Sequence, residues 1–139
     1  MVGVIIGSHG RLSEEILRTS EMIFGKQENI QTVTFETGEG SEDLVRKYEV
    51  ALGKLNKVEG ILFLVDLFGG SPFNVATSIA INEENMDILT GVNLPMLLEV
   101  CGMRESLTLD EIVFNAEESG KLGIKKFEKC IRENTEEEL

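Results

Sequence analysis

The single histidine of this chain, His9, lies in the segment Gly7-Ser8-His9-Gly10, directly after an apolar run that predicts a β-strand. In an open α/β sheet, residues that meet a ligand gather where the strands end. The N-terminus of the following helix attracts an anion such as a phosphate there. A lone histidine in a turn is more often a solvated polar residue. His9 is therefore a candidate that needs support from elsewhere in the chain.

A second segment supplies that support. The continuous apolar run at 61–65 predicts a strand buried on both faces, and it ends at Asp66. The segment Gly69-Gly70-Ser71-Pro72 then predicts a helix start, because serine is a good N-cap and proline suits the first helical position. Taken alone, this is an ordinary strand-to-helix turn. If both strands open into one crevice, His9, Asp66 and Ser71 face one another.

These residues fit a phosphoryl acceptor. A carboxylate at Asp66 that accepts a hydrogen bond from Nδ1–H of His9 leaves Nε2 free to attack phosphorus. A neutral imidazole needs no base for this step, and we expect no metal and no cofactor. The donors expected to hold the phosphoryl oxygens are three backbone N–H groups and one hydroxyl, from Phe68, Gly69, Gly70 and Ser71.

Two other kinds of chemistry fit less well. In a hydrolase, Ser71 would attack, His9 would be the base and Asp66 would orient it. The residue after the serine is Pro72, which has no N–H to give to an oxyanion hole, and G-x-S-x-G is absent. The phosphate-binding patterns G-x-G-x-x-G and G-x-x-x-x-G-K-[ST] are also absent, which disfavours a nucleotide site.

Hydrophobic periodicity predicts a doubly wound, three-layer α/β/α fold with a central, mainly parallel sheet of four strands. We expect one domain over 1–130 and an acidic, frayed tail over 131–139. The order is strand, helix, strand, helix, strand, helix, strand, a loop at Gly91–Met96, and a last helix that stops at Gly120. The expected strands are at 2–6, 30–35, 60–65 and 86–90, and the expected helices lie at 12–24, 41–55, 72–81 and 108–119.

Composition narrows the range of partners. The chain has 139 residues, with 13 basic against 25 acidic side chains and a formal charge of −12. This balance argues against nucleic acid or an anionic membrane and favours a basic protein partner. Cys101 and Cys130 have no metal-ligand spacing and are expected to be reduced thiols. No signal peptide or membrane span is evident, so we expect a cytoplasmic protein.

Over 1–128, the sequence resembles the IIA components of the mannose/fructose/sorbose family of the bacterial phosphoenolpyruvate-dependent sugar phosphotransferase system. The resemblance lies in Gly7–Gly10, Phe63–Asp66, Gly69–Asn74 and Gly91–Met96. It implies that His9 accepts a phosphoryl group from the phosphohistidine of the carrier protein HPr. His9 would pass it to a histidine of a IIB component, which serves the IIC/IID membrane complex. It also implies that Asp66 partners His9 and that Ser71 lies beside the phosphate.

Three points of this resemblance are open. Some members carry a threonine after the aspartate where this chain has Leu67. Ile124 and Phe127 are three residues apart, which favours a helix, whereas the family implies that Gly123–Glu128 is an antiparallel edge strand exchanged in a homodimer. The phosphocarrier subunit of a phosphotransferase-linked dihydroxyacetone kinase shares the histidine and the fold, and remains the alternative function. Nothing in the residues indicates which sugar is transported.

Overall fold

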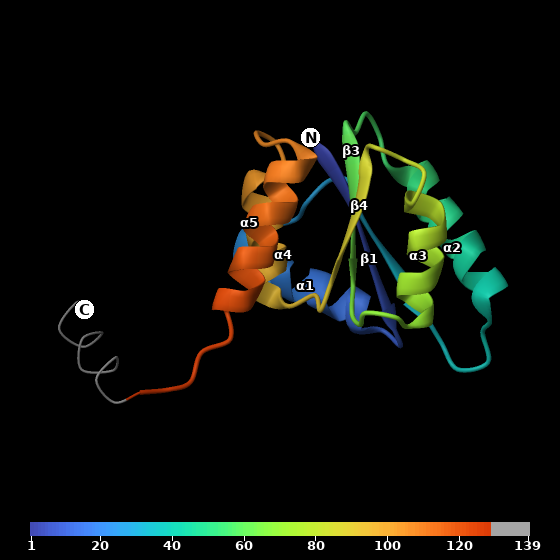
Figure 1. Ribbon diagram of the computed structural model, residues 1–139. Coiled ribbons are helices and arrows are strands. Elements are labelled where there is room, and N and C mark those ends of the chain that lie inside the picture. The colour runs from blue at the N-terminus through green and yellow to red at the C-terminus, as the bar shows by residue number, and fades with distance from the viewer. Residues whose placement is uncertain (129–139) are drawn as a thin grey trace.

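The computed structural model describes residues 1–128, which form one four-stranded parallel sheet with helices on both faces (Figure 1). The strand order is β2-β1-β3-β4, so the chain winds outward in two directions from the β1–β3 pair. The elements are β1 Val2–His9, α1 Leu12–Phe24, β2 Ile30–Phe35, α2 Ser41–Lys54, β3 Gly60–Val65, α3 Ser71–Ala80, β4 Met86–Thr90, α4 Leu94–Met103 and α5 Leu109–Leu122. The predicted fold class is confirmed.

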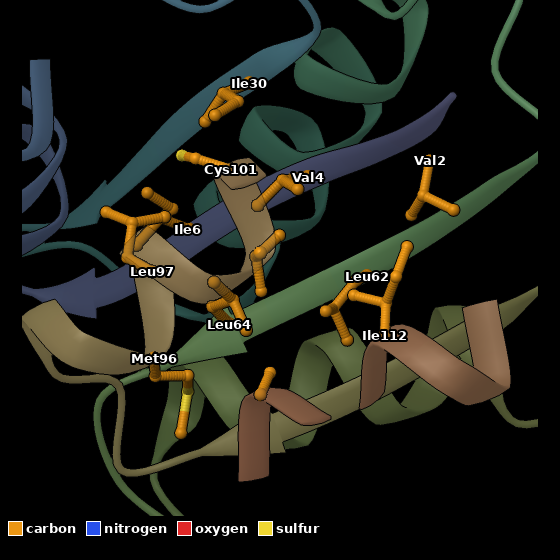
Figure 2. Close-up of a cluster of buried hydrophobic side chains, with 12 residues drawn as sticks. Val2, Val4, Ile6, Ile30, Leu62, Leu64, Met96, Leu97, Cys101 and Ile112 are labelled. Carbon is orange, nitrogen blue, oxygen red and sulfur yellow. The ribbon is translucent and has the colours of Figure 1, made fainter. Parts of the chain in front are cut away.

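The sheet separates two hydrophobic cores, because successive side chains of a strand point to opposite faces. On one face Val4, Ile6 and Leu64 pack against α1, α4 and α5 (Figure 2). On the other face Ile5 and Phe63 pack against α2 and α3. All of β3 is buried, as its uninterrupted apolar run predicts.

Helices α4 and α5 differ from the prediction. The predicted loop at Gly91–Met96 contains the start of α4, where the Asn93 side chain accepts a hydrogen bond from the Met96 N–H at 3.0 Å. The last helix does not stop at Gly120 but continues to Leu122. A Cβ at Gly120 would lie 2.9 Å from the Met96 side chain, so this glycine permits close packing of α5 on α4.

The segment 124–128 follows α5 and is neither helix nor strand within the chain. The helix that the spacing of Ile124 and Phe127 favours is therefore absent, and both side chains are exposed. The acidic tail at 131–139 and Cys130 lie outside the described residues. The prediction of a single domain over 1–130 stays a prediction. None of the helices in residues 1–128 is long and apolar enough to cross a membrane.

A buried arginine joins the elements at the sheet end opposite the strand C-termini. Arg104 follows α4, is 1% exposed, and donates hydrogen bonds to the carbonyls of Val2, Glu28 and Asn29. The Val2 N–H in turn donates to the Arg104 carbonyl at 3.0 Å. Burial lowers the pKa of Arg104. This side chain fixes the first residues of β1 and the loop that leads into β2.

Candidate functional site

His9 and Asp66 meet where the neighbouring strands β1 and β3 end. The imidazole Nδ1 lies 2.9 Å from Asp66 Oδ2, and the backbone N–H of His9 donates to the same oxygen, also at 2.9 Å. An ionised carboxylate can only accept hydrogen bonds, so Nδ1 is the donor, and in the neutral imidazole Nε2 is then the nitrogen with the lone pair. The predicted pairing is present in the structure, and it leaves one ring nitrogen available as a nucleophile.

The carboxylate is fixed more firmly than the imidazole. The second oxygen of Asp66 accepts the Leu67 N–H at 2.9 Å, so both oxygens have partners. The Asp66 side chain is 12% exposed, whereas the His9 side chain is 45% exposed. The imidazole of His9 is thus accessible, and the carboxylate that orients it is shielded from solvent. This arrangement suits a histidine that must meet another molecule at Nε2.

The N-terminus of α3 lies against the other side of the ring. A Cβ at Gly70 would lie 2.7 Å from His9 Cε1 and 3.4 Å from Nε2, so a side chain at this position would collide with the imidazole. Gly69 has φ +87°, a conformation that L residues rarely adopt and that lets the chain turn into α3. The pair of glycines is therefore needed to bring backbone this close to His9.

Free hydrogen-bond donors gather at this helix start. Gly70, not the predicted Ser71, is the N-cap residue, and Ser71 is the first residue of α3. Ser71 is half-buried, and no hydrogen bond within residues 1–128 joins it to His9. Among the described residues, the backbone N–H groups of Phe68, Gly69, Gly70 and Ser71 have no acceptor. Such a cluster at a helix N-terminus favours an anion.

The third strand that reaches the site is β2. The His9 ring packs edge-on against Phe35, with centroids 5.9 Å apart and the planes at 73°. Gly10, with φ +55°, turns the chain and donates its N–H to the Phe35 carbonyl at 2.8 Å. Phe35 is not among the predicted site residues, although its place at the end of a predicted strand is a usable signal.

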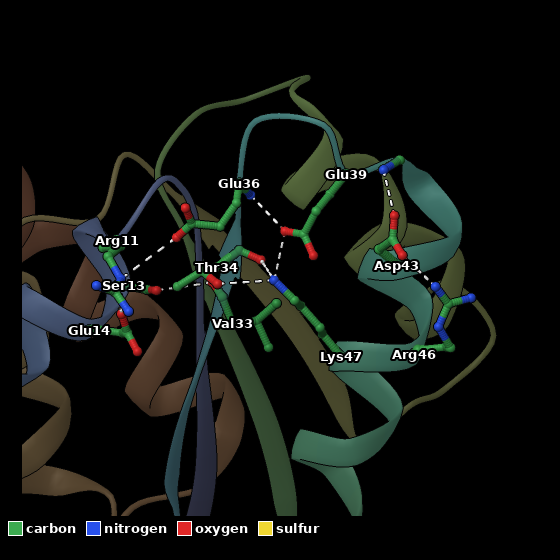
Figure 3. Close-up of polar contacts among 11 residues, drawn as sticks. Arg11, Ser13, Glu14, Val33, Thr34, Glu36, Glu39, Asp43, Arg46 and Lys47 are labelled. Carbon is green, nitrogen blue, oxygen red and sulfur yellow. Dashed lines mark hydrogen bonds and ion pairs between the residues drawn. The ribbon is translucent and has the colours of Figure 1, made fainter.

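Polar contacts around the end of β2 hold Phe35 in place (Figure 3). From α1, Ser13 Oγ donates to the Val33 carbonyl at 3.0 Å. From α2, Lys47 Nζ donates to the Thr34 carbonyl at 2.9 Å and to Glu39 Oε1 at 2.7 Å. The hydrogen bond to Lys47 is the main cause that lowers the pKa of Glu39. Helices on both faces of the sheet are thereby tied to the strand that supports the imidazole.

The rim of the site is apolar. Leu67 and Phe68 are exposed, and the Phe68 ring stacks at a tilt on Phe73 with centroids 4.7 Å apart. Leu67 stands at the position where the family resemblance implies a threonine in some members. The hydrogen bond to Asp66 comes from the backbone N–H of Leu67 and not from its side chain. The departure at this position therefore leaves the Asp66 geometry intact.

The fold and the site together define a doubly wound α/β protein with one histidine oriented by a carboxylate and faced by a helix N-terminus. The family model described as "PTS system fructose IIA component" matches residues 3–117. This chain belongs to that family of IIA components of the sugar phosphotransferase system.

Individual relatives agree with the family match. The chain is 43% identical over 125 residues to the mannose-specific EIIAB component of Escherichia coli K12, covering 89% of this chain and 39% of that protein. It is 44% identical over 115 residues to the fructose-specific EIIA component of Bacillus subtilis, covering 83% of this chain and 79% of that one. The chain therefore spans about two fifths of the E. coli relative and most of the B. subtilis one.

A solved structure shows the same fold. The phosphotransferase system component EIIA from Streptococcus agalactiae superimposes with a TM-score of 0.83 at 32% identity, over 91% of this chain and 98% of that one. These findings favour the sugar phosphotransferase system over the kinase-linked and hydrolase alternatives.

Proposed function

We propose that this chain is a phosphocarrier in which Nε2 of His9 accepts a phosphoryl group and then passes it on. The observation that carries the proposal is the pair of 2.9 Å hydrogen bonds from the Nδ1 and backbone N–H of His9 to one oxygen of Asp66. They fix the ring in position and select the tautomer whose free nitrogen is Nε2. The names of the family and of its relatives support the class of reaction.

The transfer step balances without a base. Nε2 of neutral His9 forms a bond to phosphorus while the donor's phosphorus–nitrogen bond breaks, and the donor imidazole leaves with the electron pair of that bond. The phosphorylated ring keeps its proton on Nδ1, beside the negative charge of Asp66. That charge stabilises the positive ring as it forms, in a site where the carboxylate is largely shielded from water.

The backbone at the start of α3 would hold the phosphoryl oxygens. A Cβ at Gly70 would lie nearest the Cε1 and Nε2 atoms of His9, which supports a role for the unpaired N–H groups of 68–71 on the side where phosphorus would bind. The Ser71 hydroxyl is a further donor. Aligned N–H groups and the positive end of the helix dipole favour the added negative charge.

The partners that we propose follow from the family: HPr as donor, a histidine of a IIB component as acceptor, and through it the IIC/IID complex, with transfer in the cytoplasm. The net charge of −12 supports a donor with a basic surface. The exposed side chains of Leu67 and Phe68 offer apolar contact beside His9. Both features suit a partner that must approach Nε2 closely and then leave.

Phosphorylation by phosphoenolpyruvate, Enzyme I and HPr tests this function. We expect intact mass to show one added phosphate on the unaltered chain and none on His9→Ala, because the chain has no second histidine. The adduct should be stable in base and lost in acid, as a phosphoramidate is. Ser71→Ala is the matched control and should still gain one phosphate. An acid-stable adduct that disappears in Ser71→Ala would instead support the serine chemistry.

We further propose a homodimer in which Gly123–Glu128 pairs with β4 of the other subunit. In residues 1–128, β4 pairs only with β3, so its outer edge is free. A groove lies on each face of that edge, one beside α5 with Leu89 and Met96, the other beside α3 with Thr77 and Ala80. Residues three apart point to opposite faces of a strand, so Ile124 and Phe127 would each enter one groove.

Sedimentation tests the dimer. Ile124→Lys combined with Phe127→Lys should convert a dimer to a monomer, because each lysine would place a charge where an apolar side chain would otherwise pack. Phe114→Lys, which changes an exposed phenylalanine of α5, is the control and should sediment as the unaltered chain does. A monomeric unaltered chain, or a double variant that remains dimeric, would contradict the exchanged strand.

A further inference from the structure

Tyr48, the only tyrosine of the chain, lies directly beneath the site and is fully buried. It comes from α2, and its ring packs edge-on against Phe63 of β3, with centroids 5.5 Å apart. Its hydroxyl reaches under the last residues of β1. A Cβ at Gly7 would lie 2.2 Å from the hydroxyl oxygen, so the absence of a side chain at Gly7 makes room for this group.

The hydroxyl donates a 2.8 Å hydrogen bond to the carbonyl of Pro72, in the first turn of α3. Burial, and after it the charge of Asp66, raises the pKa of Tyr48 well above its usual range. The phenol therefore stays protonated at physiological pH and remains a donor. A buried hydroxyl with a single partner at this distance is a specific link between α2 and α3.

The hydrogen bond between Tyr48 and Pro72 lies beside both segments that form the site. Gly7 lies two residues before His9, and Pro72 lies two residues after Gly70, where any side chain would collide with the His9 ring. Tyr48 thus contacts the segment that carries the imidazole and holds the segment that carries the phosphate donors. Its side chain is fully buried, so a partner protein cannot reach it.

Resting on the proposed function of His9, we propose that Tyr48 is a positioning residue, which sets the spacing between the imidazole and the N-terminus of α3 through its hydrogen bond to the Pro72 carbonyl. The inference goes beyond the His9–Asp66 pair, because it assigns the geometry of the phosphate donors to a residue outside the site. The same spacing governs both the acceptance and the release of the phosphoryl group.

Tyr48→Phe isolates the hydroxyl. It keeps the ring that packs on Phe63 and removes only the hydrogen bond to Pro72. We expect kcat for transfer from phospho-HPr to fall about two- to twelvefold, the factor that corresponds to one neutral hydrogen bond. KM for HPr should stay unchanged, because a fully buried side chain cannot touch a partner. The ³¹P resonance of phospho-His9 should shift, since the N–H groups around the phosphate have moved.

Ser78→Ala is the matched control. Its hydroxyl also donates to a backbone carbonyl of α3, that of Val75 at 2.6 Å, but it lies farther along the helix from the site. We expect this variant to keep both kcat and the ³¹P resonance. A loss that merely reflected a weakened α3 would appear in the control as well, whereas a positioning role appears only in Tyr48→Phe.

The outcomes separate this inference from the function on which it rests. An unaltered chain that takes no phosphate would overturn the proposed function, and the positioning role with it. Phosphorylation of both proteins at His9 with equal kcat and equal ³¹P shifts would overturn the positioning role alone. If Tyr48→Phe does not fold, tyrosine fluorescence decides, because the chain has one tyrosine and no tryptophan. Phosphorylation of the purified, unaltered chain should change that emission, and unchanged emission would count against the link.

Discussion

Replacing Asp66 by asparagine tests the origin of the reactivity of His9. The carboxylate accepts three hydrogen bonds, from the Nδ1 and backbone N–H of His9 at Oδ2 and from the Leu67 N–H at Oδ1. An asparagine amide has one oxygen and one NH₂ group. If the oxygen takes the place of Oδ2, the NH₂ group faces the Leu67 N–H. If the NH₂ group takes it, the ring must hold its proton on Nε2, which can then no longer attack.

The size of the effect follows from the charge that is lost. A hydrogen bond to a charged group contributes about 1.5–3 kcal/mol and a neutral one about 0.5–1.5 kcal/mol. The difference of about 1–2 kcal/mol applies to the state in which the ring becomes positive, and it corresponds to about a five- to thirtyfold slower transfer. The displaced tautomer adds to this loss. We therefore expect Asp66→Asn to slow transfer at least tenfold, and Ser71→Ala to slow it less because backbone donors remain.

The assay is the rate of phosphoryl transfer from phospho-HPr, followed by rapid quench in base and intact mass. Asp87→Asn is the matched control, because Asp87 also accepts the N–H of the next residue, at 2.8 Å, but contacts no histidine. It should transfer at the normal rate. Unchanged rates in both directions for Asp66→Asn would refute the reasoning, since Asp66 would then be only a residue that ends a strand.

Three other predictions concern stability and association. Arg104→Met should lower the free energy of unfolding by about 3 kcal/mol in a urea titration, because it removes the buried guanidinium that donates to the carbonyls of Val2, Glu28 and Asn29. Asp43→Asn should lower Tm at pH 7. The Gly40 N–H lowers the pKa of Asp43 below its ordinary value of 3.8, so the difference should vanish as the pH falls through that lowered pKa. Association with HPr in stopped flow should slow as salt rises, because the chain carries −12.

The contact between His9 and Asp66 could be predicted from the sequence because it depends on where two strands end. The strands at 30–35, 60–65 and 86–90 were predicted with the bounds that the structure has. Once the strands are parallel and β1 adjoins β3, His9 and Asp66 must lie at the same edge of the sheet. The contact between these two side chains is thus a consequence of topology, and no long-range information beyond strand order is needed to expect it.

The roles of Tyr48 and Gly120 were missed because they depend on packing between segments that are distant in the sequence. Tyr48 reads as one member of an apolar helix stripe, and nothing nearby in sequence reveals that its hydroxyl reaches Pro72. Gly120 is typical of a helix stop when only its neighbours in the sequence are considered. The reason for this glycine is the Met96 side chain of α4, which occupies the space where a Cβ would lie. The start of α4 was predicted as loop, although Asn93 before Leu94-Pro95 is a recognisable N-cap signal.

The central claim, that Nε2 of His9 is the phosphoryl acceptor, is tested most directly by NMR of the ¹⁵N-labelled protein before and after phosphorylation. The chain has one histidine, so the two ring nitrogens give unambiguous signals. We predict a one-bond coupling between ³¹P and Nε2, with Nδ1 still protonated and hydrogen-bonded to Asp66. Coupling of ³¹P to Nδ1, or a phosphorylated chain whose ring nitrogens are unchanged, would contradict the account.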